Sequence, residues 1–290
     1  MNILVTGANG FIGRRLSSRL IEQGHYVTGL SLKIPSDPPI AFKNYYQQDL
    51  TRPFVLNDPF DIVIHLAAYN ITNVGAKDRE LYTAINVGGT QNLLQGVRTK
   101  KFIYLSTTKV YKNEGRPITE ESSIAPQGAY EQSKLKAEEV CSTFLKNRSL
   151  VILRSVNVIG WGQAPKAVLP VFFQKARANQ PLDIINTALT PMQFVYVEDL
   201  IDVIEAVIRQ EDKSGIFNIA HPETISLEQL ALEIIAITHS SSVLNIKNDA
   251  TEILLSPVIC YKAQQQLGWK AKTGLIKVLK SYQDQYARVA

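Results

Sequence analysis

The sequence predicts an α/β fold, a doubly wound parallel sheet with a smaller C-terminal lobe. Three observations support this prediction. Short apolar runs rich in β-branched residues recur along the first half of the chain, as in buried parallel strands. Segments with apolar residues at helical spacing separate them, and a glycine-rich turn follows the first run directly. The alternating rhythm weakens after Gly162, shortly before the lobe that we expect to begin at residue 166.

The first strand and its turn occupy residues 2–13. Asn2 to Thr6 is too short for a helix, and an amphipathic helix follows the turn, with apolar residues at Phe11, Ile12, Leu16, Leu20 and Ile21. Glycines in such a turn allow a tight bend, close approach to a pyrophosphate and close helix–strand packing, while the helix N-terminus favours phosphate. A glycine turn without a ligand is the alternative. We assign to cofactor binding Gly7, Asn9, Gly10, Phe11, Ile12 and Gly13.

Composition restricts the class of protein. The 290 residues carry 31 basic and 26 acidic side chains, a net charge of +5, and the basic residues are spread along the chain. This distribution does not indicate a nucleic-acid surface, and no apolar stretch reaches membrane-spanning length. Cys141 and Cys260 lack metal or redox spacing, and the four histidines form no ligand pattern, so we expect no metal. With no room for a signal peptide before the first strand, we expect a cytoplasmic protein.

The second predicted strand, residues 26–30, ends at a position that selects the cofactor. An acidic residue there binds the ribose diol of NAD and repels a 2′-phosphate. This chain has Ser31 and Lys33 instead, and Lys33 could pair with a phosphate. NAD and NADP both remain possible, with NADP slightly favoured, and a solvated Lys33 is the alternative.

The next elements complete the predicted cofactor site. Residues 45–48 are expected to form a strand ending in Asp49 and Leu50, where Asp49 could meet adenine or cap a helix. Residues 61–68 are expected to form another strand, which runs into the small residues Ala67 and Ala68 after Leu66 and so leaves room for a ligand beside these three residues. A helix is expected over 81–95, and it carries Asn86 with two costly glycines.

A strand over residues 101–106 leads to a hydroxyl-rich segment with Thr107 and Thr108. Tyr130 then opens a helix with an apolar face of Leu135, Val140 and Phe144. Lys134 lies one turn after Tyr130 on the same face. An ammonium there favours the ionised phenol, so we expect a lowered Tyr130 pKa, suited to acid–base chemistry.

Later elements are a strand over 150–154, helices over 167–178, 200–208 and 227–238, and strands near 193–199 and 215–220. We divide the chain into a dinucleotide-binding domain of residues 1–165, which residues 193–220 rejoin, and a substrate lobe of residues 166–192 and 221–290.

Together these motifs resemble the extended short-chain dehydrogenase/reductase family, specifically its NAD(P)-dependent sugar-nucleotide epimerase/dehydratase group. The resemblance rests on the glycine turn, Leu66–Ala68, residues 86–90, 106–111 and 194–199, Tyr130 with Lys134, and residues 267–269. It implies a Rossmann-type sheet. It also implies that Tyr130 is the acid/base, that Lys134 holds the nicotinamide ribose, that Thr107 binds the substrate oxygen and that Asn86 supports them. Thr107, Thr108 and Asn157 are expected at the substrate.

The sequence departs from the family pattern at three places. The Asp-Glu pair of the 4,6-dehydratases is replaced by Thr108 and Lys109, so elimination of water is not expected. An arginine often found before the 194–197 strand is replaced by Met192-Gln193, and an Arg-Pro pair by Ser256-Pro257. A diphosphate would therefore need other partners, or the substrate is not a standard nucleotide sugar.

The resemblance implies an NAD(P)-dependent epimerase or 4-ketoreductase of sugar nucleotides. A reductase of another carbonyl substrate, or a non-catalytic NAD(P)-binding sensor or scaffold, is the alternative. The resemblance also implies a homodimer, for which we expect the helix over 130–145 to form the interface.

Overall fold

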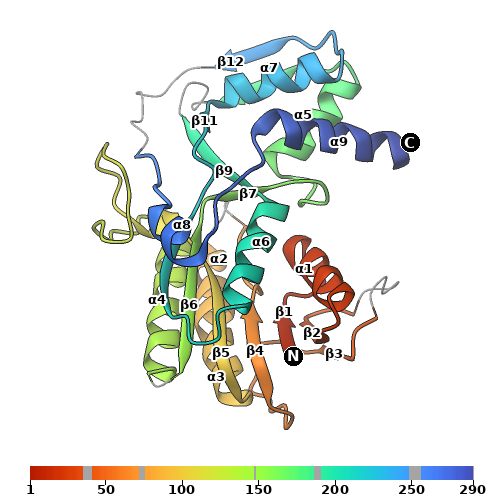
Figure 1. Ribbon diagram of the computed structural model, residues 1–290. Coiled ribbons are helices and arrows are strands. Elements are labelled where there is room, and N and C mark those ends of the chain that lie inside the picture. The colour runs from red at the N-terminus through yellow and green to blue at the C-terminus, as the bar shows by residue number, and fades with distance from the viewer. Residues whose placement is uncertain (35–40, 72–75, 147, 186–190, 248–255, 290) are drawn as a thin grey trace.

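A seven-stranded parallel sheet forms the centre of the molecule (Figure 1). The computed structural model describes residues 1–34, 41–71, 76–146, 148–185, 191–247 and 256–289. The strand order is β10-β6-β5-β4-β1-β2-β3. The strands are β1 (Asn2–Thr6), β2 (Tyr26–Ser31), β3 (Asn44–Gln47), β4 (Phe60–His65), β5 (Thr99–Thr107), β6 (Ser149–Ser155) and β10 (Gly215–Ile219).

Helices cover both faces of this sheet. Alternate residues of β1 point to opposite faces, so Ile3 and Val5 enter one core and Leu4 the other. The first core is closed by α1 (Phe11–Glu22), α6 (Val197–Ile208) and α8 (Tyr261–Leu267). The second is closed by α3 (Gly89–Gly96) and α4 (Ala129–Phe144). The predicted doubly wound α/β fold is confirmed.

Strand β1 lies where the order of the sheet reverses, with β2 on one side and β4 on the other. Connections leave in opposite directions at such a point, so the carboxyl ends of β1 and β4 border a natural ligand crevice. The glycine turn follows β1 and residues 66–68 follow β4. The fold therefore brings the two predicted cofactor segments to the same edge.

The C-terminal region builds a separate core of its own above the carboxyl edge of the sheet (Figure 1). It contains a three-stranded sheet of β11 (Thr224–Ile225), β9 (Met192–Tyr196) and β7 (Asn157–Ile159), and a pair of β12 (Leu244–Lys247) and β8 (Leu182–Ile185). Helices α5 (Val168–Arg177), α7 (Leu227–Ile237) and α9 (Leu275–Val289) supply most of its apolar side chains. Of the segments expected to rejoin the dinucleotide domain, β10 enters the large sheet, whereas β9 pairs with β7 and β11. The domain boundaries stay a prediction.

We predicted one regular helix over residues 81–95, and this prediction is wrong about the type of helix. The chain there runs through α2 (Ala76–Leu81), a π-helix η1 (Tyr82–Gly88) and α3. Gly88 and Gly89 lie at the junction, and a Cβ on Gly89 would meet the Leu50 side chain at 3.1 Å. Gly89 thus permits close packing against Leu50, whereas a Cβ on Gly88 would make only an ordinary contact at 3.8 Å. The wider helical turn is of a kind common at functional sites.

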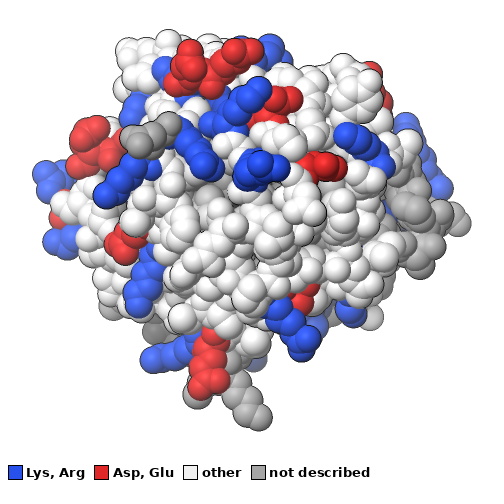
Figure 2. All heavy atoms as spheres, turned by 90° about the horizontal axis from the view of Figure 1, so that it is seen from below, with Lys and Arg blue, Asp and Glu red and all other residues white. Residues whose placement is uncertain are grey.

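Three smaller expectations can be compared with the structure. Charged side chains of both signs are interspersed on the lower face (Figure 2). Cys141 and Cys260 are both free. Within the described ranges, no helix has the length and apolar character needed to cross a membrane, and no metal-binding cluster of His, Cys, Asp and Glu is present.

Candidate functional site

The glycine turn is shaped by contacts that leave no space for side chains. Gly7 has a φ of +68°, and a Cβ there would lie 2.9 Å from the Ala67 nitrogen. A Cβ on Gly13 would lie 2.2 Å from the Gly7 carbonyl oxygen, so α1 packs directly against the turn. Gly10 is exposed and Asn9, Phe11 and Ile12 are partly exposed. This bare backbone before a twelve-residue helix has the form that accepts a pyrophosphate.

The end of β2 is tied to this turn. The Asn9 amide donates to the Ser31 hydroxyl at 3.1 Å, and the Gly7 amide donates to the Leu30 carbonyl at 2.8 Å. Ser31 is buried and Lys33 is exposed. Ser31 therefore supports the turn, while Lys33 extends into solvent beside it.

Asp49 follows β3 and forms a local turn. Its carboxylate accepts the Thr51 amide at 2.9 Å and the Thr51 hydroxyl at 2.8 Å, and these bonds lower the Asp49 pKa. No helix follows in the described chain between Leu50 and Pro59, so the helix-cap alternative is wrong. Leu50 is buried, and its carbonyl accepts the Asn92 side chain at 2.8 Å.

The segment after β4 lies opposite the glycine turn. Leu66, Ala67 and Ala68 are each partly exposed, and the Ala67 amide donates to the Thr6 hydroxyl at 3.2 Å. The small side chains leave backbone accessible beside Gly7. We call the glycine turn (residues 7–13) together with residues 66–68 the dinucleotide edge.

Helix α4 buries a different face from the one predicted. Leu135 and Val140 are only partly buried and Phe144 is 42% exposed. The buried face consists of Ser133, Lys134, Ala137, Glu138 and Cys141. Most of these side chains are polar, which is why an apolar pattern misidentified the face.

Lys134 is 3% exposed, and its ammonium reaches β5, donating to the Leu105 carbonyl at 2.6 Å. The same nitrogen lies 4.1 Å from the centre of the Tyr104 ring. Burial lowers the pKa of Lys134 to about 7, although the Glu138 carboxylate acts in the opposite direction. Lys134 can therefore exchange a proton near neutral pH.

Tyr130 is partly buried, with its ring 5.9 Å from that of Tyr82. Burial raises the Tyr130 pKa, and Glu131 and Tyr82 raise it further. The expected lowering by Lys134 is therefore wrong for this arrangement, because desolvation dominates and the ammonium is directed to Leu105. Helical spacing places the two residues on one face but does not fix where the ammonium points.

Asn86 joins η1 to α4 and to the segment after β4. Its side chain accepts the Tyr69 amide at 2.7 Å and donates to the Tyr69 carbonyl at 3.0 Å. It also donates to the Ser133 hydroxyl at 2.9 Å, and Ser133 donates to the Tyr130 carbonyl at 2.7 Å. Asn86 is 1% exposed, so this supporting contact is shielded from water.

The candidate substrate residues lie at the carboxyl end of β5 and just after β6. Thr107 pairs in register with Ser155, and its hydroxyl accepts the Lys109 amide at 3.2 Å, starting a 3₁₀ turn, η2 (Thr108–Val110). Thr107 and Thr108 are 6% and 8% exposed, whereas Asn157, at the start of β7, is exposed. Thr107 and Lys134 are thus both held on the end of β5.

Sequence reasoning missed a buried ion pair behind Lys134. Arg154 of β6 binds Glu138 through two nitrogens, with Nη2 2.6 Å from Oε2. Ser106 also donates to Glu138, and the Arg154 guanidinium covers the Tyr111 ring at 4.7 Å. A signal was available in the sequence, because Glu138 follows Lys134 by one helical turn, as Lys134 follows Tyr130, and so lies on the same face of the helix.

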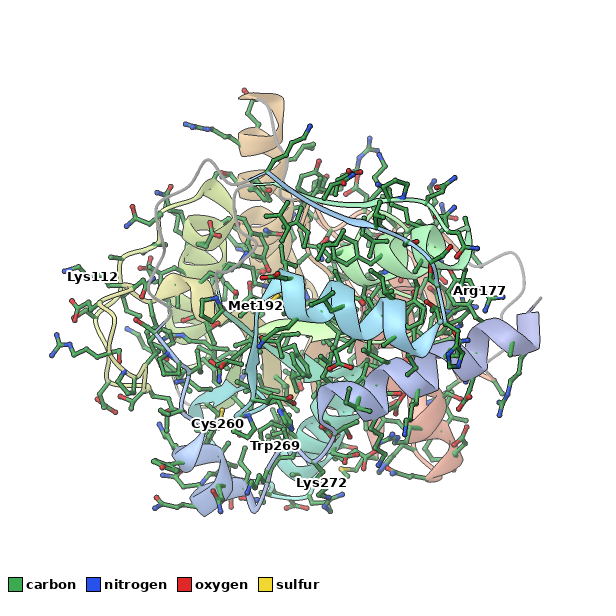
Figure 3. All side chains as sticks on the ribbon, turned by 90° about the horizontal axis from the view of Figure 1, so that it is seen from above. Lys112, Arg177, Met192, Cys260, Trp269 and Lys272 are labelled. Carbon is green, nitrogen blue, oxygen red and sulfur yellow. The ribbon has the colours of Figure 1, made fainter. Side chains whose placement is uncertain are left out.

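The residues that replace the expected arginines have structural partners. Gln193 is buried and donates to the His221 and Val258 carbonyls at 3.1 and 3.2 Å. Ser256 accepts the Gly115 amide at 2.9 Å. Figure 3 shows Met192 near the middle of the view, with Lys112 and Arg177 towards opposite sides of the molecule.

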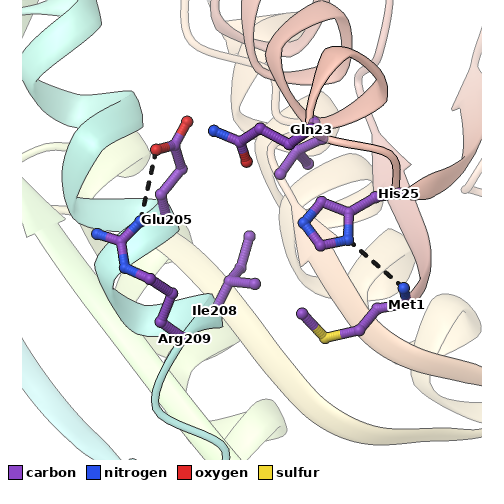
Figure 4. A pocket seen from close by; sticks show the side chains of 7 residues that line it. Met1, Gln23, His25, Glu205, Ile208 and Arg209 are labelled. Atoms are coloured by element: carbon purple, nitrogen blue, oxygen red, sulfur yellow. Dashed lines mark hydrogen bonds and ion pairs between the residues drawn. The ribbon is translucent and has the colours of Figure 1, made fainter.

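Two cavities lie away from these residues. One, of about 290 Å³, lies at the opposite, amino end of the strands, where His25 faces the Met1 nitrogen at 3.5 Å (Figure 4). Its lining is Met1, Leu20, Gln23, His25, Glu205, Ile208 and Arg209. The other, of about 300 Å³, is lined by residues between Lys112 and Ser123. Ligands of doubly wound sheets bind at the carboxyl ends of the strands, so the first cavity is not the candidate site. The second lies in the loop that follows β5 and η2, and its lining includes none of the predicted site residues.

Comparisons with known proteins agree with this geometry. Residues 3–220 match the model of the NAD dependent epimerase/dehydratase family. Protein CapI of Staphylococcus aureus is 30% identical over 238 residues, which cover 72% of this chain and 70% of CapI. The dTDP-D-glucose 4,6-dehydratase of Dictyostelium discoideum is 27% identical over 268 residues, covering 81% of this chain. The chain spans 62% of that dehydratase and 47% of a trifunctional Arabidopsis thaliana relative.

Among solved structures, the UDP-glucuronic acid 4-epimerase of Bacillus cereus, in complex with UDP-glucuronic acid and NAD, has a TM-score of 0.87. It is 25% identical, and the match covers 100% of both chains. The UDP-glucose 4-epimerase of Thermotoga maritima, at 24% identity, has the same TM-score and covers 100% of this chain and 99% of its own. The latter similarity shows the shared fold.

Proposed function

The chain belongs to the NAD dependent epimerase/dehydratase family, and from this premise we propose that it is a sugar-nucleotide epimerase or 4-ketoreductase. The observation that carries the proposal is the position of α4. Its Lys134 reaches the end of β5, and the first turn of α4 is bound through Ser133 and Asn86 to the segment after β4. In our proposal, these bonds let helix α4 hold Tyr130 beside the dinucleotide edge.

The residues of the dinucleotide edge fit a nicotinamide dinucleotide. Gly7 and Gly13 occupy places that a Cβ would obstruct, and the N-terminus of α1 supplies free amides for the pyrophosphate. When bound, the nicotinamide accepts or supplies the hydride. The protein's part is position and charge. In our proposal Tyr130 moves the matching proton, Lys134 orients the ribose, and the Thr107 hydroxyl hydrogen-bonds the substrate oxygen.

We propose epimerisation or ketone reduction in preference to loss of water. Elimination needs an acid and a base beside the reacting carbons. The two residues after Thr107 are Thr108, a buried hydroxyl, and Lys109, an exposed amine. Neither is a carboxylate, which distinguishes this chain from the dehydratase pattern that it otherwise resembles.

The substrate is proposed to be a nucleotide sugar whose diphosphate is held without an arginine on β9. Met192 and Gln193 occupy that place, and Gln193 is committed to the His221 and Val258 backbone. The same observation favours the second candidate function, reduction of a carbonyl compound that has no diphosphate. A panel of UDP- and dTDP-sugars beside simple keto sugars distinguishes the two.

For the cofactor, we propose that the site accepts NAD and that Lys33 extends binding to NADP. Ser31 carries no charge and is bonded to Asn9, so no carboxylate opposes a 2′-phosphate at this strand end. Lys33→Glu should weaken NADP binding more than tenfold while changing NAD affinity less than threefold, by fluorescence titration. If the substitution changes the NAD and NADP affinities equally, Lys33 is a solvated side chain that does not contact the 2′-phosphate.

We also propose a cytoplasmic homodimer that uses α4, whose Phe144 is 42% exposed. Phe144→Lys should shift the mass measured by light scattering from dimer to monomer. A monomeric parent protein would refute this assembly.

The deciding experiment compares the parent protein with Tyr130→Phe. We expect turnover of a panel sugar nucleotide to fall by at least about 100-fold, because the transferred proton loses its carrier, while NAD affinity stays within twofold. Full activity of Tyr130→Phe would refute the mechanism. Cofactor binding without turnover of any panel member by the parent would support the non-catalytic alternative.

A further inference from the structure

A continuous chain of buried hydrogen bonds runs beneath the candidate site from the dinucleotide edge to Tyr130. It starts at the Ala67 amide, which donates to Thr6 at 3.2 Å. Thr6 lies 2.7 Å from His65 Nδ1, and His65 Nε2 lies 2.9 Å from the Thr90 hydroxyl. Thr90 donates to the Asn86 carbonyl at 2.6 Å. The Asn86 side chain continues the chain through Ser133 to the Tyr130 carbonyl.

The direction of each bond follows from the number of available hydrogens. The single Thr90 hydroxyl hydrogen is used by the Asn86 carbonyl, so the Thr90 oxygen must accept from His65 Nε2–H. In a neutral imidazole Nδ1 is then an acceptor, and it takes the Thr6 hydroxyl hydrogen. The Thr6 oxygen remains free to accept the Ala67 amide. Only the neutral Nε2–H tautomer satisfies all four groups.

The environment of His65 keeps it in that form. It is 1% exposed, and burial, aided by the Lys134 ammonium, lowers its pKa to about 3. The Phe102 and Tyr104 rings pack beside it, with centroids 5.9 and 5.5 Å away. A protonated ring would donate from both nitrogens, so the Thr6 hydroxyl hydrogen would have to turn away from Nδ1 and find another acceptor.

We infer that His65 is a positioning residue, which through Thr6 and Thr90 fixes the first turn of α4 relative to the dinucleotide edge. The inference rests on the proposed function for its consequence, the alignment of Tyr130 with the nicotinamide. Each linking residue is at most 3% exposed: Thr6, His65, Thr90, Asn86 and Ser133. Water therefore cannot replace a lost member, and the loss should be felt at Tyr130.

Thr90 offers the sharpest test, because two substitutions distinguish the contribution of its hydroxyl group from that of its branched shape. Thr90→Val keeps the branched shape and breaks the chain, whereas Thr90→Ser keeps the hydroxyl. Thr273→Val is the matched control, since the Thr273 hydroxyl is also buried and donates to Asp199 at 3.1 Å in another part of the molecule. All three proteins are compared with the parent for NAD affinity, melting temperature, kcat and KM.

We expect Thr90→Val to lower kcat roughly 10- to 100-fold, since small misplacements of a reacting group have effects of this size, with NAD affinity within about threefold. Thr90→Ser should recover kcat to within about threefold of the parent. Thr273→Val should lose melting temperature but keep its kcat. Equal kcat values for the two valine variants, measured on folded protein, would overturn the inference.

His65 itself is tested by a double-mutant cycle with His65→Phe and Thr90→Val. Residues of one hydrogen-bond chain act together, so the kcat of the double variant should be no lower than that of the slower single variant. If the fold-losses of kcat in the two single variants multiply in the double variant, the inference is overturned. If His65→Phe does not fold, the Thr90 pair alone decides.

A measurement without substrate separates this inference from the proposed function. NMR of tyrosine labelled at Cζ, with Tyr130 assigned through Tyr130→Phe, reports the surroundings of that phenol, whose pKa is raised by burial, Glu131 and Tyr82. Its signal should move in Thr90→Val and not in Thr90→Ser or Thr273→Val. An unmoved signal would refute the inference even if the parent is active. A moved signal supports it even if no panel sugar is turned over.

Discussion

Breaking the buried Glu138–Arg154 pair should be among the most destabilising single changes in this protein. The two side chains are 4% and 5% exposed, and three nitrogen–oxygen distances of 2.6 to 3.2 Å join them. Arg154→Met leaves the Glu138 carboxylate buried with Ser106 as its remaining hydrogen-bond donor among the described residues. An uncompensated buried charge of this kind costs about 3–5 kcal/mol.

That magnitude is a large part of a typical free energy of unfolding, about 5–15 kcal/mol. Urea denaturation followed by circular dichroism should therefore show a midpoint lowered by about 1 M or more for Arg154→Met. The matched control is Lys175→Met, which breaks the more exposed pair with Asp183, whose side chains are 33% and 46% exposed. That change should cost at most about 1 kcal/mol.

The double variant Glu138→Leu/Arg154→Met tests the reasoning itself. Removing both charges leaves no unpaired ion in the buried site, so the double variant should be more stable than Arg154→Met by about 2 kcal/mol or more. If the losses of Glu138→Leu and Arg154→Met simply add, the two groups are not coupled and the explanation is wrong.

Three further predictions follow from the geometry. Gly13→Ala places a Cβ 2.2 Å from the Gly7 carbonyl oxygen, so NAD affinity and melting temperature should both fall, at a cost of about 1–3 kcal/mol; unchanged NAD titration would contradict the close packing. In cofactor-free protein, Lys134 has a pKa of about 7 when folded and an ordinary, higher value when unfolded, so the unfolded state binds more protons above pH 7 and stability rises with pH there. Lys134→Met should flatten that rise in urea titrations between pH 6.5 and about 9, and an identical slope would exclude Lys134 as its source. Asp199→Ala removes an acceptor of the Lys272 and Thr273 amides and the Thr273 hydroxyl, which should cost about 2–3 kcal/mol and destabilise the region before α9 in hydrogen exchange; uniform exchange across the chain would argue against this local role.

The sheet could be predicted because its signals are local. β-branched apolar runs and the glycine turn report on burial and backbone shape within a few residues. Strands β1 and β6 lie within one residue of their predicted ranges, whereas β4 ends three residues before the predicted end at residue 68. The strands of the C-terminal lobe were harder to predict from the sequence. Strands β11 and β12 are stabilised by pairing with β9 and β8, which are distant in sequence, and short strands of this kind have weak patterns.

Helix α4 shows a second limit of prediction from the sequence, which concerns buried polar residues. Apolar spacing indicated Phe144 as part of the buried face, but the residues actually buried include Glu138 and Ser133. Buried polar groups require partners, and those partners, Arg154 and Asn86, come from other elements. The sequence could place Tyr130 and Lys134 on one face, but only the three-dimensional arrangement reveals that burial governs both pKa values.

The π-helical turn at Tyr82–Gly88 has a consequence for the length of this segment. Such a turn accommodates one more residue than an α-helical turn. Each residue of an α-helix advances the side-chain direction by about 100°. Shortening this stretch by a single residue would let it relax to a regular helix, and Asn86 would rotate away from Ser133 or from Tyr69. Insertions and deletions here should therefore be far less tolerated than in the exposed loop between Arg52 and Asp58.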